Sequence, residues 1–158
     1  MEPARTFVLR QQVLRPHQRV EEMALLGSDH PDSIVIGAAV PASRDVVATA
    51  AVSPEEPPAE LELVLPPGRR WRLRSMATRP ELRGSGIGAI VLGAALEHVA
   101  GLGGGVVWCS ARTPALSFYE RAGFVTFGDV WVDALIGPHV MMWRPVPPAT
   151  TRGSAPDE

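Results

Sequence analysis

The 158-residue sequence contains neither lysine nor asparagine, and its only cysteine is Cys109. A single cysteine excludes an intramolecular disulfide and any metal cluster held by several cysteines. The absence of lysine excludes the Walker phosphate loop, because that motif requires a Gly-Lys-Ser/Thr sequence. All 15 basic residues are therefore arginine. This bias, together with abundant glycine, proline and alanine, is typical of a GC-rich bacterial genome rather than of a particular function.

The chain also has little net charge and no apolar run of membrane-spanning length. The net charge of −2 lacks the basic footprint that nucleic-acid binding normally requires. No segment approaches the roughly 18 uninterrupted apolar residues that suggest a membrane span. The N-terminus also lacks a basic region followed by an apolar one, as a secretory signal would have. We therefore expect a cytoplasmic protein with no nucleic-acid or membrane partner.

Length and composition predict one domain. A hydrophobic content of 46% in 158 residues is enough for one sizeable core and leaves little room for a second domain. We expect this domain to span residues 1–145. The Pro/Thr/Ser/Gly-rich residues 146–158 are expected to form a disordered tail.

The first half of the chain is dominated by strand patterns. Thr6–Gln11 is expected to form a short strand, and prolines and a glycine between residues 14 and 32 leave room for at most a helical turn. Two apolar runs, Ser33–Val40 and Asp45–Ser53, predict an antiparallel hairpin. Residues 54–59 are expected to form a mobile Pro/Glu loop, and residues 60–65 to extend the sheet.

The second half alternates strands with helices. Trp71–Ala77 has a period of two, which places Arg72, Arg74 and Met76 on the face opposite Trp71, Leu73, Ser75 and Ala77. Apolar residues at helical spacing predict a helix over residues 86–100, with Glu97 and His98 on its wetter side. The glycines at 101–105 should end it. Residues 106–110, 124–127 and 138–144 predict strands, and 114–122 a short helix capped by Thr113.

This order of elements predicts an α/β fold class. Several antiparallel strands are followed by strand–helix–strand–helix–strand–strand, which requires one parallel crossover. The sheet should therefore be mixed, mostly antiparallel and flanked by helices.

The turn Arg83–Gly88, at the start of the long helix, is the clearest functional feature. Glycine lets the backbone approach a ligand closely, and the N–H groups at a helix N-terminus bind phosphate oxygens. Arg83 can add a charged contact. The dinucleotide fingerprint fits poorly, because glycines stand at 84, 86 and 88 and other glycines occupy the position of its acidic residue.

The pattern Arg83-x-x-Gly86-x-Gly88, after a strand ending Met76-Ala77-Thr78, resembles motif A of the GNAT acyltransferase superfamily. The segment Ala115-x-x-Phe118-Tyr119-Glu120-Arg121-Ala122-Gly123-Phe124 resembles the second motif of that family. The resemblance implies the acyl-CoA N-acyltransferase fold, with a central pair of parallel strands that splay apart. It also implies transfer of an acetyl group from acetyl-CoA, the acyl-CoA co-substrate, to a primary amine.

The resemblance further implies where acetyl-CoA binds. The backbone of Met76 and Thr78 should hydrogen-bond the pantetheine arm as an added strand would, and a nearby N–H should polarise the thioester. The family often has asparagine where this chain has Arg112. Arg112 therefore either forfeits an amide contact or adds one to phosphate. The implied cofactor-binding residues are Met76, Ala77, Thr78, Arg83, Gly84, Ser85, Gly86, Ile87, Gly88, Ala89, Arg112 and Tyr119.

Tyr119, the only tyrosine, occupies the position where the family keeps its general acid. A reference pKa of about 10 suits protonation of a departing thiolate; the alternative is that Tyr119 only packs beside Phe118. No carboxylate lies in residues 71–77 to act as base. His139 is the first candidate because imidazole titrates near neutrality, with a structural hydrogen bond as its alternative, and Asp133 is the second.

Other side chains suggest chemistry less strongly. Arg74 could face an anionic acceptor, although a solvated or ion-paired arginine is the commoner role. Cys109 is interpreted as packing rather than as a nucleophile. The histidines show no metal-ligand spacing, so no metal site is expected.

Three functions remain open from the sequence. The first is an N-acetyltransferase acting on a small amine, amino acid or peptide terminus. The second is an acyl-CoA-binding or sensing module without catalysis, and the third is a nucleotide-phosphate binder. Because family members often dimerise, a homodimer is a further expectation.

Overall fold

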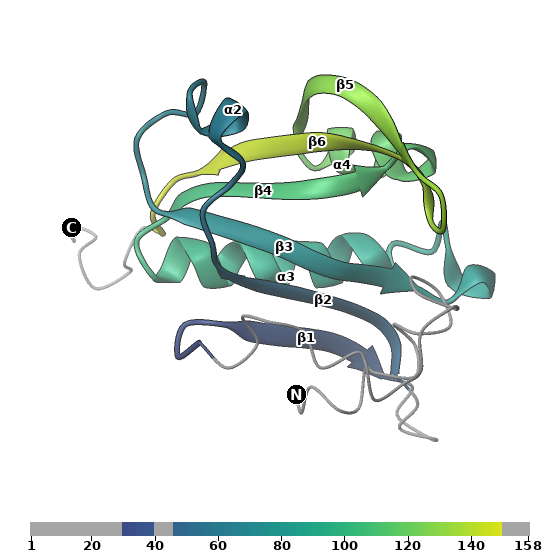
Figure 1. The fold of residues 1–158 in the computed structure, drawn as a ribbon. Coiled ribbons are helices and arrows are strands. Elements are labelled where there is room, and N and C mark those ends of the chain that lie inside the picture. The colour runs from purple at the N-terminus through teal and green to yellow at the C-terminus, as the bar shows by residue number, and fades with distance from the viewer. Residues whose placement is uncertain (1–29, 40–45, 150–158) are drawn as a thin grey trace, which may run out of the picture.

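A computed structural model of the chain describes residues 30–39 and 46–149 (Figure 1). These residues form a six-stranded sheet of order β1-β2-β3-β4-β6-β5. The strands are β1 Ile34–Ala39, β2 Val46–Pro54, β3 Arg70–Thr78, β4 Gly105–Arg112, β5 Val125–Asp133 and β6 Gly137–Val146. The helices are α2 Ala59–Glu62, α3 Ile87–Gly101 and α4 Leu116–Arg121, with 3-10 turns η3 Pro80–Leu82 and η4 Thr113–Ala115.

The two faces of the sheet are covered differently. Helix α3 lies along one face, and the segment that contains α2 crosses the other (Figure 1). The core on the α3 side joins Val91, Leu92, Ala95 and Val99 of the helix to buried strand residues such as Trp71. Burial of these apolar side chains is the main favourable term that fixes α3 on the sheet.

Several sequence predictions are confirmed. The hairpin is present, because β1 and β2 pair antiparallel with Ile34 opposite Val52. The parallel crossover is β3–α3–β4, and α3 covers the predicted range shifted by one residue. The strand predicted at residues 6–11 and the turn joining the hairpin lie outside the described residues.

Other predictions are wrong. Residues 60–65 do not extend the sheet, because α2 begins after Pro58 and buries Leu61, which is 1% exposed. Thr113 makes no side-chain cap, because a 3-10 turn with Pro114 near its start precedes α4. His98 is half-buried rather than solvated: its ring lies 5.9 Å from that of Trp71, and Nε2 hydrogen-bonds the Asp32 carbonyl at 2.7 Å.

The loop 54–59, expected to be mobile, is held to the sheet at Glu55. The backbone N–H of Glu55 donates to the Arg70 carbonyl at 3.1 Å. Its carbonyl accepts from Trp108 Nε1 at 2.9 Å. The first contact extends the β2–β3 pairing by one residue, and the second holds the loop against the face of the sheet opposite α3.

A bulge in β3 shifts the predicted alternation. Thr49 pairs with Ala77 but Ala51 with Arg74, so β3 has one residue more than β2 over this stretch. Ser75 occupies the bulge with a φ of 58°. Beyond it, Met76 packs against the core that α3 covers. The prediction that Met76 shares a face with Arg72 and Arg74 is therefore wrong.

The central strands separate along their length. β3 and β4 pair only where Arg70–Arg72 lie opposite Val106–Trp108. β4 pairs with β6 from Gly105 through Arg112. The C-terminal half of β3 therefore leaves β4, which is the splayed arrangement that the resemblance implied.

The C-terminal boundary differs from the expectation. β6 continues to Val146, and the Ala149 N–H donates to the Ala100 carbonyl at 2.9 Å. Residues 146–149 are thus part of the packed domain. The rest of the expected tail lies outside the described residues.

The side chain of Arg70 closes the connection from α2 to β3. It is 9% exposed and pairs with both carboxylate oxygens of Glu62 at 2.8 and 2.7 Å. It also donates to the carbonyls of Pro66 at 2.6 Å and Gly68 at 3.1 Å. The hydrogen bond from Arg70 is the main cause that lowers the pKa of Glu62 below its ordinary value of 4.5.

We predict a pH-dependent contribution of this pair to stability. Because the pKa of Glu62 is lowered in the folded chain, its contribution is present above the ordinary value of 4.5 and lost as the pH falls through the lowered one. Thermal unfolding as a function of pH should show a shallower acid decline for Glu62→Gln than for the unsubstituted protein. Glu60→Gln, on the exposed side of α2, is the control. Parallel declines for Glu62→Gln and the unsubstituted protein would contradict the prediction.

Candidate functional site

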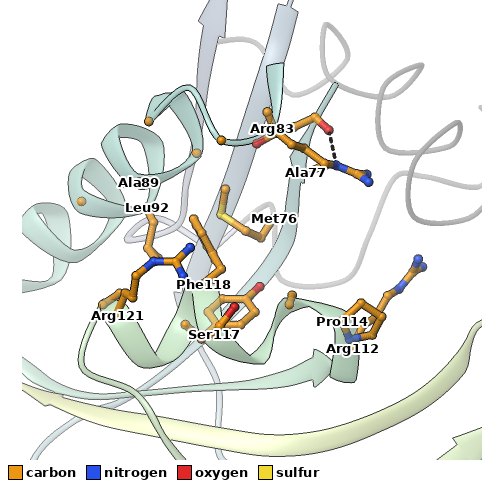
Figure 2. Close-up of a pocket in the computed structure, with 18 of the residues that line it drawn as sticks. Met76, Ala77, Arg83, Ala89, Leu92, Arg112, Pro114, Ser117, Phe118 and Arg121 are labelled. Atoms are coloured by element: carbon orange, nitrogen blue, oxygen red, sulfur yellow. Dashed lines mark hydrogen bonds between the residues drawn. The ribbon is translucent and has the colours of Figure 1, made fainter. Parts of the chain in front are cut away.

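A large cleft lies on the α3 side of the sheet, with a volume of about 1040 Å³. Its walls are the end of β3, the first turns of α3 and the segment from Arg112 to Ala122. Figure 2 shows Arg121 beside Leu92 at one end and Arg112 beside Pro114 at the other, with Met76 and Phe118 between them. The two segments that resemble family motifs therefore face each other across one cavity.

Most of the predicted cofactor-binding residues line this cleft, and a few do not. Ser85 and Ile87 are not among the described residues that line it, and neither is His139, the residue predicted as a catalytic base. Ser85 is exposed, and its hydroxyl donates to the Leu82 carbonyl. The predicted residues that line the cleft are Met76, Ala77, Thr78, Arg83, Gly84, Gly86, Gly88, Ala89, Arg112 and Tyr119.

The backbone before α3 is shaped by glycine. Gly84 and Gly86 have φ values of 86° and 91°, in the left-handed region that side chains disfavour. Gly86 is the N-cap of α3, and it has no side chain to cap that end. The N–H groups of the first helical turn have no intrahelical acceptor, and the first turn contains no acidic residue. This end of α3 therefore presents donors and positive potential to the cleft.

Among the described residues, the charged groups in the cleft are all of one sign. Arg83, Arg112, Arg121 and Arg144 line it, and no aspartate or glutamate of residues 30–39 and 46–149 does. Arg83 is anchored weakly, with Nε 3.4 Å from the Thr78 carbonyl. Such an arrangement favours a polyanionic ligand.

The sequence did not single out Arg121 or Arg144. Arg121 lies within the second motif, so its position was a usable signal. Arg144 comes from β6, and only the pairing of β6 with β4 brings it near α4. Its Nη1 donates to the Ala122 carbonyl at 2.7 Å, which places a cation at the C-terminus of α4, where the helix dipole favours it.

The sequence also did not single out the apolar wall of the cleft. Leu92 and Leu96 of α3 face Phe118 of α4 across the cleft. The ring of Phe118 meets that of Tyr119 edge-on, with centroids 5.2 Å apart. Helical spacing marked these leucines as core, and only the gap between α3 and α4 makes them part of a cavity.

Tyr119 both packs in the core and borders the cleft. It is 7% exposed, and its ring lies 5.5 Å from that of Phe124. Burial is the main cause that raises the pKa of Tyr119 well above its ordinary value. Its phenol therefore stays protonated across the neutral range.

The remaining candidates lie elsewhere. His139 is 5% exposed, stacks on Trp131 at 5.6 Å, and its Nδ1 lies 2.8 Å from the Gly137 carbonyl. Asp133 accepts from the N–H groups of Leu135 and Ile136 at 2.8 and 3.1 Å in the turn before β6. Burial raises the pKa of Cys109 to about 12, so its thiol stays neutral and is a poor nucleophile.

The comparisons with known proteins agree with this geometry. The model of the acetyltransferase (GNAT) family matches residues 4–124. The chain is 28% identical over 139 residues to the uncharacterized N-acetyltransferase YitI of Bacillus subtilis (strain 168), covering 88% of this chain and 89% of that protein.

Solved structures share the fold. An aminoglycoside 6'-N-acetyltransferase complexed with coenzyme A matches with a TM-score of 0.66 and 15% identity, covering 93% of this chain and 92% of that one. The phosphinothricin acetyltransferase of Sinorhizobium meliloti in complex with AcCoA matches with a TM-score of 0.61 and 19% identity, covering 89% and 78%. The chain belongs to the acetyltransferase (GNAT) family, and its class of reaction is acyl-CoA-dependent N-acetyl transfer.

Proposed function

We propose that the cleft binds acetyl-CoA and that the acetyl group passes directly to a primary amine. The observation that carries this proposal is the uncapped N-terminus of α3 in a cleft where the described lining residues include four arginines, Arg83, Arg112, Arg121 and Arg144, and no carboxylate. Within the predicted segment 83–89, the N–H groups at the start of α3 hold the pyrophosphate, because those of Arg83 and Ser85 already donate to the Pro80 and Leu82 carbonyls at 3.3 and 3.2 Å. The arginines supply positive charge along the rest of the ligand.

The end of β3 fits the pantetheine arm. Beyond Arg72, β3 no longer pairs with β4, while its other edge stays paired with β2 through Thr78. The edge at Met76–Thr78 is therefore turned toward the gap, where an extended ligand can add as a strand would. The thioester then lies between the separating strands.

The transfer needs no covalent enzyme intermediate. The amine nitrogen attacks the thioester carbon, a backbone N–H near Met76 or Ala77 stabilises the oxyanion, and the C–S bond breaks. Tyr119 donates its phenolic proton to the departing sulfur. Its raised pKa keeps the proton on the phenol when the thiolate forms, and the same shift makes the phenol a weaker acid than an exposed tyrosine.

The general base stays a prediction. His139 is held by the Gly137 carbonyl at Nδ1, which leaves Nε2 to accept a proton, but the residue does not line the cleft. Asp133 is committed to the turn before β6. An amine that arrives already neutral attacks without a base from the chain, and the proton that its nitrogen loses as the amide forms passes to water or returns to the Tyr119 phenolate.

One observation favours the second candidate, an acyl-CoA-binding module without catalysis. In the described part of the chain, neither a carboxylate nor a histidine lines the cleft.

Cytoplasmic location also stays a proposal. Among residues 30–39 and 46–149, no helix has the length and apolar character needed to cross a bilayer. A homodimer is proposed through β5, an edge strand with exposed Val130, Trp131 and Val132.

The first test combines ligand binding with turnover. At 100 times its dissociation constant, acetyl-CoA should stabilise the protein by about 2.7 kcal/mol, and ATP or NAD should not. Thiol release is then followed with a panel of amines, amino acids and peptides. Stabilisation by acetyl-CoA without thiol release from any acceptor would favour the non-catalytic module. Stabilisation by ATP or NAD alone would overturn both in favour of a nucleotide binder.

We predict that Gly88→Ala weakens CoA binding. A Cβ at Gly88 would lie 3.0 Å from Thr78 Oγ1 and 3.3 Å from Phe118 Cε1, within the cleft. The dissociation constant for CoA, measured by calorimetry, should rise by roughly one order of magnitude. Gly101→Ala is the matched control, because no described residue outside its own helical turn lies within 4 Å of its added Cβ. Equal affinity in Gly88→Ala and the unsubstituted protein would contradict this placement of the ligand.

We predict that Tyr119→Phe loses turnover but keeps CoA binding. Removing the phenol should lower kcat roughly a hundredfold or more, with little change in the CoA dissociation constant. Because the pKa of Tyr119 is raised, the unsubstituted enzyme should not lose this acid below about pH 10. Steady-state thiol release across pH measures both effects. An unchanged kcat in Tyr119→Phe would remove Tyr119 from the mechanism.

A further inference from the structure

A cluster of charged side chains lies on the face of the sheet opposite the cleft. Arg72 and Arg74 alternate with Trp71 and Leu73, which are buried in the core under α3, so the two arginines project from the other face. Glu55 reaches them from the loop after β2. Arg72 Nη1 donates to Glu55 Oε2 at 3.0 Å, and Arg74 Nη2 donates to Oε1 at 2.6 Å.

The charges in this cluster do not balance. One carboxylate serves two guanidinium groups, which leaves a net charge of about +1 on side chains that are 28% and 21% exposed. Burial, followed by the charge of Arg74, lowers the pKa of Arg72 despite the ion pair with Glu55. A second anion would relieve this repulsion.

Hydrogen-bond donors in the cluster are also unused. The Nε atoms of Arg72 and Arg74 are buried and have no partner among the described residues. Buried polar groups without a partner are rare in folded proteins and call for an explanation. Because the Nε atoms are enclosed, a ligand with paired acceptor oxygens would instead accept from the Nη atoms of the two guanidinium groups.

The cluster is built rigidly. The guanidinium of Arg72 stacks over Trp108, with Cζ 4.8 Å from the ring centroid. Trp108 in turn donates to the Glu55 carbonyl at 2.9 Å. Arg72 is therefore held by an ion pair and a ring, so a ligand that uses it loses little side-chain entropy on binding.

The cluster stands where the central strands part. Arg72 and Trp108 form the last β3–β4 pair, and Arg74 lies beyond it. Met76–Thr78, which follow Arg74 on the same strand, line the cleft on the α3 side. If acetyl-CoA fills the cleft, an amine that approaches the thioester from the opposite face would pass Arg74.

We propose that Arg72 and Arg74 bind a carboxylate of the acceptor and so select amines that carry one. The proposal rests on the function proposed above, because it assigns the acceptor end of that site. A monoanion neutralises the cluster, whereas a phosphate dianion would overcompensate it. Free amino acids and other amino-carboxylates are the class of acceptor that fits.

Binding can be tested without turnover. The full chain, saturated with CoA, is titrated by calorimetry with N-acetylglycine, N-acetyl-β-alanine and N-acetyl-γ-aminobutyrate, and with the primary amide of each. At least one acid should bind about tenfold or more tightly than its amide, as expected for charge-assisted hydrogen bonds. Equal binding of every acid and its amide would overturn the proposal. Inorganic phosphate that binds more tightly than all three acids would overturn the carboxylate assignment.

Variants separate recognition from a structural role. Arg74→Gln should abolish the preference for acid over amide, and Arg74→Lys should retain part of it. Glu55→Gln should bind the preferred acid several-fold more tightly, because the two arginines then lack their only counter-charge in the described cluster. A cluster that only anchors the loop gives no such gain, so unchanged acid affinity in Glu55→Gln would count against recognition.

Arg69→Gln is the matched control. Arg69 also stacks on a tryptophan, Trp71, at 4.7 Å and pairs with a carboxylate, Asp32, at 2.8 Å, but it precedes β3 at the far end from the gap. This variant should keep the acid preference, and all variants should keep the CoA affinity of the unsubstituted protein. Loss of the preference in Arg69→Gln would show that it does not arise at Arg72 and Arg74.

Turnover distinguishes this proposal from the proposed function. Thiol release is measured with glycine, β-alanine and γ-aminobutyrate and with their amides. If no amine is acetylated but the binding pattern holds, the transferase proposal fails and the carboxylate site stands. If acids and amides are acetylated with equal KM, the transferase proposal stands and the carboxylate site fails.

Discussion

The structure depends on the limited contact between β3 and β4. Each of these strands pairs over most of its length with another neighbour, β3 with β2 and β4 with β6, but they pair with each other only from Arg70 to Arg72. Two sheet halves are thus joined at one end and open at the other. The helix α3 spans both halves and buries its apolar side chains against them, which holds the opening in place without closing it.

This separation positions functional groups on each face of the sheet. On the α3 side, the unpaired end of β3 faces the glycine-rich start of α3 and the motif of α4, and these enclose the cleft. On the other side, the same separation begins at Arg72 and leaves Arg74 beside the gap. In the proposed arrangement, the thioester and the amine approach each other from opposite faces and do not compete for one cavity.

The distribution of charge matches this division. Within the described residues, the cleft contains arginines and an uncapped helix N-terminus but no carboxylate, as a ligand with several phosphates requires. The opposite face combines two arginines with Glu55. This smaller excess of positive charge suits the single carboxylate of the proposed acceptor. Because the chain has no lysine, the cationic side chains of both regions are arginines, and their planar donors favour paired oxygens.

The structure also explains why side chains of one strand serve both faces. Up to Arg74, β3 alternates regularly, but the bulge at Ser75 adds a residue and turns Met76 toward α3. Without that bulge, the period of two would place Met76 beside Arg72 and Arg74. A local backbone irregularity thus decides which residues meet acetyl-CoA and which meet the acceptor in the proposed arrangement.

The sequence alone determined the elements whose signals are local. Apolar runs predicted the β1–β2 hairpin, and periodicity predicted β3 and α3. The glycines at 84, 86 and 88 located the turn that begins α3, because backbone freedom is a property of the residue itself. The motif around Phe118 and Tyr119 pointed to the same ligand. Only the tertiary structure decided the bulge, the helix at residues 59–62 and the pairing of Glu55 with Arg72 and Arg74. Those features depend on strand register and on contacts between segments distant in sequence, about which a local pattern carries no information.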